Sequence, residues 1–530
     1  MKIFTLSYWQ DVIAQLDKTS FPLSSAEESR TLDRALISEY LPAFDWMQRA
    51  GGFAFRFIET EYPKRPKLWI VVGSGKNAGD GWILAHQAAE AGWSVTVITL
   101  NSTALLNSSA KQAYELARQI PLLKTVDFQQ GSLEFEELKP DTDLIVDAIL
   151  GTGLSRPVSG DYEKVIEWIN NQKCPKISLD VPTGVCSDSG QIFGYAVYAD
   201  ITLTFITRKR GLMLNAGREH AGRVIFNDLG ADPKICRQQK IQLHSLNTHS
   251  LIPKPRRRDA HKGHYGHLLC IGGNENMPGA IVMAAEAGSH IGTAKVTIAT
   301  HKEHFNGILA RSPHIMLCDI NNQKHLEFAC SVASCILIGP GIGRSDWAKN
   351  LTKTILQLDK PLVIDADALY HLAEIELPKA SSPRPWILTP HPGEAQRLLK
   401  NSTLPKTDPI QAIQQLINQY YCTMVLKGAG TLVADPINAS SLPIHLCLQG
   451  NPGLAKGGSG DVLGGLIAGL CAQGFGLDIA SRLAVGLHAN SADELARIFG
   501  ERSFNVSDLA LSSGRLFDAW VGFKAFIYKH

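Results

Sequence analysis

The chain of 530 residues lacks the closely paired cysteines that are typical of structural zinc sites and dithiol redox motifs. Its ten cysteines are scattered singly, and none forms a Cys-x-x-Cys motif. Two histidine pairs, His261/His264 and His301/His304, have spacings that could suit a metal, but no cysteine or carboxylate cluster joins them. We therefore expect reduced thiols in a cytoplasmic protein and no metal at these histidines.

Long hydrophobic runs and a strong net charge are also absent. No stretch of about 18 apolar residues occurs, so the sequence predicts no transmembrane helix. Asp11 interrupts the N-terminal segment before the core of a signal peptide could form. The formal net charge of +2 gives no reason to expect a nucleic-acid or membrane partner. What remains is the composition of an ordinary globular protein, long enough for two or more domains.

Strand-like and helix-like segments alternate along the first half of the chain. The strand-like segments are short apolar runs at residues 68–72, 94–100, 143–147, 176–180 and 200–206. Helical patterns cover residues 26–39, 46–58 and 82–91. This alternation predicts a parallel sheet with helices on both faces.

The alternation stops at residues 232–258 and then begins again. The interruption is polar and ends in Arg256, Arg257 and Arg258. A basic run can bind nucleic acid, but in a nearly neutral chain it favours a solvated linker. Further strands are predicted at residues 266–271, 295–299, 335–338, 362–364, 386–388 and 424–426, with a helix of small residues at 280–291. We therefore predict two α/β domains, residues 1–240 and 241–530.

Three predicted strands of the first domain end in polar or glycine-rich segments, at residues 73–81, 147–157 and 180–184. Ligands bind parallel sheets at the carboxyl ends of the strands, so Asp80, Asp147 and Asp180 should meet at one edge. Acid and hydroxyl oxygens suit a hard cation, and glycines allow a phosphate-bearing ligand to approach closely. Singly, these residues could also be helix caps and turns.

These segments resemble the epimerase domain of the bifunctional NAD(P)H-hydrate repair enzymes. The matching motifs are KNAGDG at 76–81, VDAILGTGLSRPVSG at 146–160, LDVPTG at 179–184 and MQRAG at 47–51. The resemblance implies that the hydrated nucleotide is bound by Lys76, Asn77, Ala78, Gly79, Asp80, Gly151, Thr152, Gly153, Leu154, Ser155, Arg156, Pro157 and Asp180. It also implies a potassium ion held by Asn77, Asp147 and Thr183.

Two positions depart from the family pattern. Lys76 replaces an asparagine and Ala78 replaces a glycine. Lys76 could add affinity for phosphate or mark a weakened site. The expected reaction interconverts the R and S forms of hydrated NADH or NADPH, in which a hydroxyl lies beside the ring nitrogen. It needs reversible cleavage at that ring carbon with proton transfer, for which we expect Asp180 to serve.

The segment at 451–463, NPGLAKGGSGDVL, is the most informative of the second domain. Gly457, Gly458 and Gly460 surround Asp461, and an apolar run of helical spacing follows. A glycine-rich turn that opens a helix presents free N–H groups to an anion, usually phosphate. Asp461 could then take a proton from a hydroxyl that attacks the phosphate. The alternative is a tight turn with a charged helix cap.

Other strand ends of this domain carry related chemistry. Asp365 and Asp367 follow one predicted strand, and could also cap a helix. Lys427 begins a Lys-Gly-Ala-Gly-Thr segment with open amides suited to phosphates. Together with the 451–463 segment, these features predict phosphoryl transfer onto a hydroxyl.

This region is similar to the dehydratase half of the same family, which has a ribokinase-like fold. The matching motifs are GGNENMPGA, IGPGIG, DADAL, LTPHPGEA, LKGAGT and GGSGD. The resemblance implies a hydrated-cofactor site of Ala280, Gly341, Gly343, His391 and Asp461. It implies binding of the adenosine phosphates by Lys427, Gly428, Ala429, Gly430, Thr431 and Gly460. The family's Pro-Glu motif is Pro313-His314 here, and Lys456 stands where a small hydroxyl residue is common.

The predicted fold class is therefore α/β, with an N-terminal Rossmann-like parallel sandwich and a C-terminal ribokinase-like domain. By resemblance, the substrates are NADHX and NADPHX, the phosphoryl donor is ADP, and the products are NAD(P)H, AMP and phosphate. We expect magnesium with the nucleotide, and the resemblance implies a homo-oligomer. Two alternatives are a ribokinase-type small-molecule kinase with a dinucleotide-binding appendage, and a nucleotide-sensing protein without catalysis.

Overall fold

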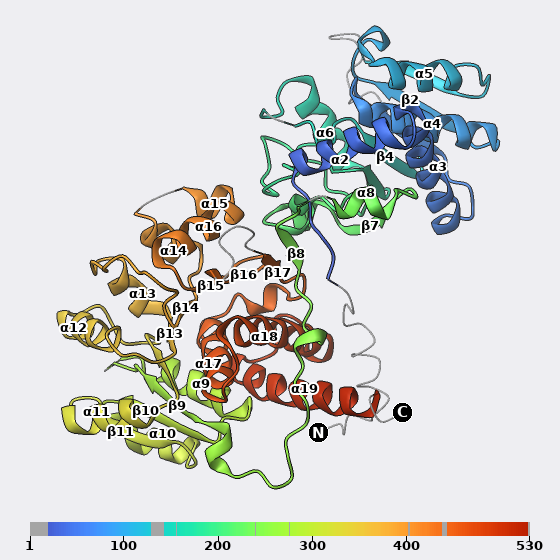
Figure 1. Ribbon diagram of the computed structural model, residues 1–530. Helices are drawn as coiled ribbons and strands as arrows, with labels where there is room; N and C mark the ends of the chain where they lie inside the picture. The colour runs from blue at the N-terminus through green and yellow to red at the C-terminus, as the bar shows by residue number, and fades with distance from the viewer. Residues whose placement is uncertain are drawn as a thin grey trace. The chain divides into compact units, whose positions relative to one another are not determined.

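Figure 1 shows the computed structural model, which describes residues 20–128, 142–154, 156–238, 240–274, 276–400, 403–436 and 443–527. The chain divides into two compact units. The N-terminal unit is Pro22–Leu243, and the C-terminal unit contains the described residues from His244 onward together with Ser20 and Phe21. Among the described helices, none is both long and apolar enough to cross a membrane.

The N-terminal unit contains a seven-stranded sheet in the order β3-β2-β1-β4-β5-β6-β7. All neighbouring strands are parallel. The strands are β1 (Leu68–Val72), β2 (Val95–Thr99), β3 (Lys124–Asp127), β4 (Leu144–Ala148), β5 (Lys176–Leu179), β6 (Ile201–Phe205) and β7 (Arg223–Asn227). The strand order changes direction between β1 and β4, and such a switch point opens a crevice at the carboxyl edge.

Helices cover both faces of this sheet because successive strand residues point to opposite sides. Ile70 and Val72 pack in one core with α2 (Ala26–Glu39), α3 (Ala43–Glu61), α4 (Lys76–Glu90), α5 (Ser108–Ala117) and α8 (Pro233–Arg237). Val71 packs in the other core, against α6 (Asp161–Asn171). The short α7 (Gly217–His220) precedes β7.

The C-terminal unit contains a ten-stranded sheet in the order β11-β10-β9-β12-β13-β14-β15-β16-β17-β8. The run from β11 to β15 is parallel, and β16 pairs antiparallel with both β15 and β17. The strands are β8 (Leu243–Ser245), β9 (His267–Ile271), β10 (Lys295–Thr300), β11 (Met316–Asp319), β12 (Cys335–Ile338), β13 (Leu362–Ile364), β14 (Trp386–Leu388), β15 (Thr423–Leu426), β16 (Leu432–Ala434) and β17 (Ile444–Leu446).

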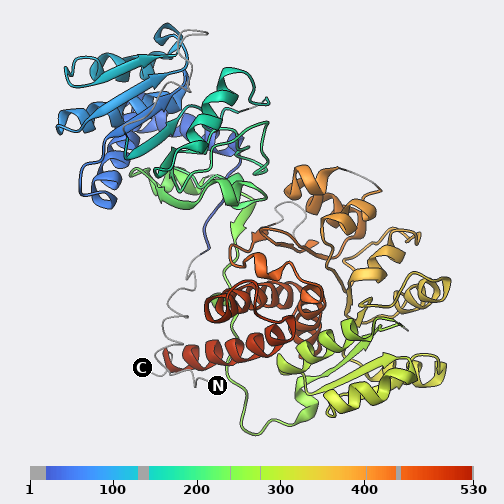
Figure 2. The same ribbon diagram turned by 180° about the vertical axis from the view of Figure 1, so that it is seen from behind.

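Four helices form the core on one face of this sheet, as Figure 2 shows from behind. They are α9 (Pro278–His290), α17 (Ser459–Ala472), α18 (Leu477–Phe499) and α19 (Val506–Ile527). The remaining helices connect the strands: α10 (Phe305–Arg311), α11 (Gln323–Val332), α12 (Asp346–Ile355), α13 (Ala366–Leu372), α14 (Pro392–Leu398), α15 (Leu404–Thr407) and α16 (Pro409–Tyr420). The predicted fold class, two α/β domains built on largely parallel sheets, is confirmed.

One predicted boundary is wrong in an informative way. The glycine-rich segment at 76–81 was expected to be a loop before a helix at 82–91, but α4 begins at Lys76. Glycine disfavours helices, so Gly79 and Gly81 suggested a loop. A Cβ at Gly79 would meet the Sδ of Met47 at 2.3 Å, and one at Gly81 would meet the Cβ of Ala148 at 2.8 Å. These glycines therefore allow close packing of α4 on α3 and the sheet.

Candidate active sites

A cavity of about 490 Å³ lies in the N-terminal unit at the carboxyl ends of its strands. The segments that follow β1, β4, β5 and β6 all reach it, and α2 and α3 form further walls. Its lining includes seven of the residues predicted for this site: Lys76, Asn77, Asp80, Gly151, Thr152, Gly153 and Asp180. The structure therefore brings the three predicted strand-end segments together.

Asp180 forms a buried ion pair in this cavity. The Nζ of Lys209 lies 2.5 Å from Oδ1 of Asp180 and also donates to the carbonyl of Phe205 at 2.7 Å. Lys209 is only 4% exposed, so water screens the pair little. Asp180 has a φ of +63°, a left-handed conformation that is uncommon outside glycine and often found at functional sites.

Two further carboxyl groups share this environment. Burial raises the pKa of Asp80 well above its ordinary value, and the nearby Asp180 carboxylate raises it further. Burial also raises the pKa of Asp33, against the opposing effect of Lys209. Two carboxyl groups with raised pKa values thus line the same cavity as a carboxylate paired with lysine, an arrangement suited to moving protons.

Beneath the cavity, the residues predicted to hold potassium form one polar network. Asn77 donates through Nδ2 to the carbonyls of Leu150 and Leu179, both at 3.1 Å. Its Oδ1 is buried and has no hydrogen-bond partner among the described residues. Thr183 donates through Oγ1 to Oδ1 of Asp147 at 2.7 Å and accepts from the N–H of Leu150 at 3.0 Å.

This network fits an alkali cation. The carboxylate of Asp147 is 1% exposed, and burial raises its pKa despite hydrogen bonds from Thr183 and Ser178. No lysine or arginine of the described residues pairs with it, so its charge is compensated only by neutral donors. An unpaired buried oxygen of Asn77 beside a buried carboxylate is the type of donor set that a hard cation prefers.

The other predicted residues of this unit lie away from the cavity lining. Ala78 and Gly79 are buried in the packing of α4, although their amides belong to its first turn, where anions bind. Leu154, Arg156 and Pro157 continue the segment beyond Gly153, and Ser155 lies outside the described residues. Their contact with a nucleotide stays a prediction.

Sequence reasoning missed three charged residues that line this cavity: Lys209, and Arg30 and Asp33 of α2. Lys209 lies four residues after the end of β6, at the same carboxyl edge as the three predicted segments. The strand-end rule that found Asp180 would therefore have found Lys209 as well. Asp33 lies on α2, and no pattern in the sequence placed that helix beside the sheet edge.

In the C-terminal unit, Asp461 lies in the first turn of α17, whose N-cap is Gly458 with a φ of +95°. The first N–H bonded back into the helix is that of Val462, to the carbonyl of Gly458 at 3.0 Å. Of the preceding amides, that of Ser459 donates to the carbonyl of Lys456 at 3.3 Å, whereas those of Gly460 and Asp461 have no backbone acceptor among the described residues and lie at the helix terminus, which attracts anions. Burial raises the pKa of Asp461 to about 7, and the Asp365 carboxylate adds to this shift.

A half-buried lysine, Lys427, pairs with Asp365 beside this helix terminus. The Nζ of Lys427 lies 2.9 Å from Oδ1 of Asp365 and 3.9 Å from Oε2 of Glu394. Burial alone would lower the pKa of Lys427, but Asp365 and Glu394 together raise it. A Cβ at Gly460 would lie 3.3 Å from this Nζ, so the lysine predicted to bind phosphate lies beside the glycine-rich turn.

The residues predicted to contact the hydrated cofactor lie on neighbouring loops and, for Ala280, in the first turn of α9. The N–H of Asn274 donates to the carbonyl of Gly341 at 2.6 Å, which joins the β9–α9 and β12–α12 loops near Ala280. Gly341 has a φ of +63°, and a Cβ there would lie 3.4 Å from that of Ala280. The N–H of Gly343 donates to Asp367 at 3.2 Å.

His391 and Glu394 lie on the segment that follows β14, at the carboxyl edge of the same sheet. His391 is the N-cap of α14, and its ring accepts from the N–H groups of Gly393 and Glu394 while Glu394 accepts from the N–H of His391. Burial lowers the pKa of His391, and Lys427 lowers it further, so its imidazole is neutral near pH 7. Burial raises the pKa of Glu394 to about 7.

The turn between β15 and β16 contains the other predicted nucleotide-binding residues, Gly428, Ala429, Gly430 and Thr431. Gly430 has a φ of +94°, and no atom lies within 4 Å of a Cβ built on Gly428 or on Gly457. These two glycine-rich segments are therefore open where a ligand would approach. The C-terminal unit thus combines an open amide turn, a titratable carboxyl and a half-buried lysine.

Comparison with known proteins agrees with this division of the chain. A family model described as NAD(P)H-hydrate dehydratase matches residues 268–512, and one described as YjeF-related protein N-terminus matches residues 44–211. The bifunctional NAD(P)H-hydrate repair enzyme Nnr of Coxiella burnetii is 39% identical, over 91% of this chain and 96% of its own length. The chain belongs to the bifunctional NAD(P)H-hydrate repair enzyme family. The resemblance noted in the sequence is thereby confirmed.

Other members of the repair enzyme family match over similar lengths. The Vibrio cholerae enzyme is 35% identical over 93% of this chain and 96% of its own, and the Escherichia coli enzyme is 34% identical over 88% of each. Among solved structures, an ADP/ATP-dependent NAD(P)H-hydrate dehydratase from Bacillus subtilis, co-crystallized with ATP/Mg²⁺, is 28% identical. It covers 52% of this chain and 96% of its own, with a TM-score of 0.45.

Proposed function

We propose that the protein repairs hydrated NADH and NADPH by two reactions, one in each unit. Residues 1–240 interconvert the R and S epimers, and residues 241–530 dehydrate the S epimer at the expense of ADP, releasing NAD(P)H, AMP and phosphate. Family membership over nearly the whole chain supports this assignment. The structural observation that carries it is Asp461, a carboxyl with a pKa of about 7 in the first turn of a helix opened by glycines.

In the dehydratase, Asp461 accepts the hydroxyl proton of the hydrated ring as its oxygen attacks the terminal phosphorus of ADP. The bond from that phosphorus to the bridging oxygen breaks, and AMP departs. The amides of Gly457, Gly458 and Gly460 stabilise the charge on the transferring group. The ring nitrogen lone pair then expels phosphate, and loss of a ring proton restores the double bond.

The neighbouring residues take the binding roles. Lys427 to Thr431 and Gly460 bind the adenosine phosphates, and Ala280, Gly341, Gly343 and His391 contact the hydrated cofactor. Lys427 is already held by Asp365 at 2.9 Å, and an ammonium has further N–H groups to give to phosphate. Magnesium accompanies the nucleotide through its phosphates and neutralises part of their charge.

In the epimerase, Asp180 moves the proton of the ring hydroxyl, and the Lys209 ammonium keeps the Asp180 carboxylate in place. The cavity of about 490 Å³ has the size of a small-molecule site. Lys76 and the amides of the first turn of α4 bind the pyrophosphate. Asn77, Asp147 and Thr183 would hold a potassium ion, whose charge would favour binding of the anionic nucleotide.

The compartment and assembly follow from the same proposal. None of the ten cysteines, all of which are described residues, forms a disulfide, in agreement with a reducing compartment such as the cytoplasm. We propose that the enzyme acts there as a homo-oligomer on small molecules, without nucleic-acid or membrane partners.

An assay with separated epimers tests the two activities. We expect S-NADHX with ADP and magnesium to regain nicotinamide absorbance and to release one phosphate per molecule repaired. R-NADHX should follow only as fast as it is epimerised. A stable phosphorylated product without recovery of absorbance would identify a kinase, and ADP binding without any turnover would identify a sensor. Either result would contradict the proposal.

The dehydration rate should depend on pH through Asp461. Below its pKa of about 7 this carboxyl holds a proton and cannot accept another, so kcat should fall about tenfold per pH unit as pH decreases, and level off above pH 7. Glu394 is among the carboxylates that raise the pKa of Asp461. The Glu394→Gln variant should therefore show the same fall in kcat at low pH, with the midpoint of that fall shifted to lower pH. A flat profile between pH 5 and 8, measured on S-NADHX, would exclude Asp461 as the base.

A further inference from the structure

One wall of the N-terminal cavity comes from outside the region that the family model matches. The match begins at residue 44, whereas α2 spans Ala26–Glu39. Four residues of α2 line the cavity: Ser29, Arg30, Asp33 and Ile37. They follow one another at about helical spacing, while Leu32 and Leu36 face the core. The cavity is therefore incomplete without this helix.

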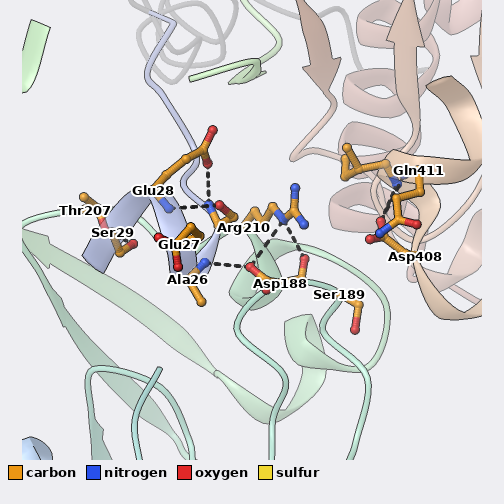
Figure 3. Close-up of polar contacts among 12 residues, drawn as sticks. Ala26, Glu27, Glu28, Ser29, Asp188, Ser189, Thr207, Arg210, Asp408 and Gln411 are labelled. Carbon is orange, nitrogen blue, oxygen red and sulfur yellow. Dashed lines mark hydrogen bonds and ion pairs between the residues drawn. The ribbon is translucent and has the colours of Figure 1, made fainter. Parts of the chain in front are cut away.

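The start of α2 is fixed firmly to the segments around the cavity, as Figure 3 shows. The N–H of Ala26 donates to Oδ1 of Asp188 at 2.6 Å. The hydroxyls of Ser29 and Thr207 are hydrogen-bonded at 2.7 Å. Ser25 and Glu28 form a reciprocal capping box. Such contacts fix the helix position, and with it the direction of the side chains one turn further on.

The residues before α2 also fix Lys209. Ser24 forms a parallel bridge with Lys209, in which the N–H of Ser24 donates to the carbonyl of Arg208 at 2.8 Å and the N–H of Arg210 donates to that of Ser24 at 3.0 Å. The same short segment therefore positions Lys209, which pairs with Asp180, and delivers α2 to the cavity.

Asp33 lies one helical turn beyond Ser29, on the same side of α2. Lys209 and Asp180 both act electrostatically on Asp33, and Lys209 is itself paired with Asp180. Asp33 thus meets the cavity from a different wall than the carboxylate at the end of β5.

The epimerisation requires two proton-transferring groups. The hydroxyl proton goes to a base as the carbonyl forms. The bond from that carbon to the ring nitrogen breaks, and its electron pair goes to the nitrogen, which takes a proton from an acid. Closure of the ring on the other carbonyl face reverses both transfers, so no oxidant or co-reactant is consumed.

We propose that Asp33 is the acid of this pair, opposite Asp180 as the base, so that α2 is part of the epimerase active site. The inference rests on the proposed epimerase function of this unit. Burial raises the pKa of Asp33, which favours the protonated form that an acid needs. The charged groups that face it are Lys209, Asp180 and Lys76, and Asp80 shares the cavity.

The test is the rate of R-to-S equilibration of NADHX without ADP, measured by chromatography on the full chain. Asp33→Asn should lower kcat by about 100-fold or more, leave KM within about threefold, and remove the high-pH limb of the profile. Asp33→Glu should restore part of the rate. Glu39→Gln, a matched change on the exposed end of the same helix, should behave as wild type. Dehydration of S-NADHX should be unchanged in all three.

The outcomes separate the inference from the function on which it rests. If the wild-type protein does not equilibrate the epimers, the epimerase function itself is wrong. If it does, and Asp33→Asn keeps the wild-type kcat and pH profile, Asp33 is not the acid. A raised KM with a lowered melting temperature and an unchanged pH profile would show that Asp33 only supports α2. If the high-pH limb of the kcat profile is lost in Asp80→Asn but kept in Asp33→Asn, the proton-donating acid is Asp80.

Discussion

Asp461→Asn is expected to abolish dehydration of S-NADHX while ADP still binds. The asparagine has nearly the same shape but cannot accept the hydroxyl proton, and removal of a general base costs about 10²–10⁴-fold in kcat. That loss corresponds to about 3–5 kcal/mol of transition-state stabilisation. Binding of ADP should be unchanged or tighter, because the substitution removes a negative charge near the phosphates and leaves the Lys427–Asp365 pair in place.

Two controls make this result specific. Asp518→Asn removes a carboxylate from the exposed side of α19 and should retain full activity. Equilibration of R and S epimers in the Asp461 variant should also remain at the wild-type rate, since Asp461 lies in the other unit. Retained dehydration in Asp461→Asn would remove this residue from the mechanism and leave Glu394, with its pKa of about 7, as the next candidate.

Asp180→Asn should stop repair of the R epimer but spare repair of the S epimer. We expect equilibration to slow by about 10²–10⁴-fold, because the amide cannot take the ring hydroxyl proton. Asparagine is the suitable replacement here, since the φ of +63° is one that Asn tolerates far better than Ala. The assay is the consumption of pure R-NADHX in the presence of ADP and magnesium, with S-NADHX measured in parallel.

The same change leaves the buried Lys209 without its carboxylate, so stability must be measured alongside activity. Removing one partner of a buried pair can cost about 3–5 kcal/mol. Asp180→Glu keeps the charge but moves the carboxylate, and should fold well with much lower activity. Asp161→Asn, in the first turn of α6, should remain fully active. Rapid R-form repair by a folded Asp180→Asn protein would refute the assignment.

The sequence predicted the fold well where strands were buried and apolar. Residues 335–338, 362–364 and 386–388 match β12, β13 and β14 residue for residue. The strands that were missed are short, or lie at sheet edges and have polar faces, such as β3 (Lys124–Asp127) and β7 (Arg223–Asn227). An edge strand packs on fewer neighbours, so its pattern of apolar residues is weaker.

The sites were predictable as far as they lie on strand ends. Asp180, Asn77 and Asp147 came together because parallel strands present their carboxyl ends at one edge. Pairing partners were not predictable, because Lys209 is 29 residues from Asp180 and Lys427 is 62 residues from Asp365. A sequence shows that a lysine is present, but the register of distant segments decides whether it faces solvent, phosphate or a carboxylate.

The separate hydrophobic cores of the two units have a consequence for inherited damage. Because these cores share no residues, we expect a substitution that unfolds the core around α3 and α4 to leave the cluster of α9, α17 and α18 folded. A cell with such a lesion would still repair the S epimer of the damaged coenzyme, but the R epimer would accumulate. A lesion of equal severity in the C-terminal unit would block repair of both epimers. Harmful substitutions should therefore be tolerated better in the N-terminal unit than in the C-terminal unit.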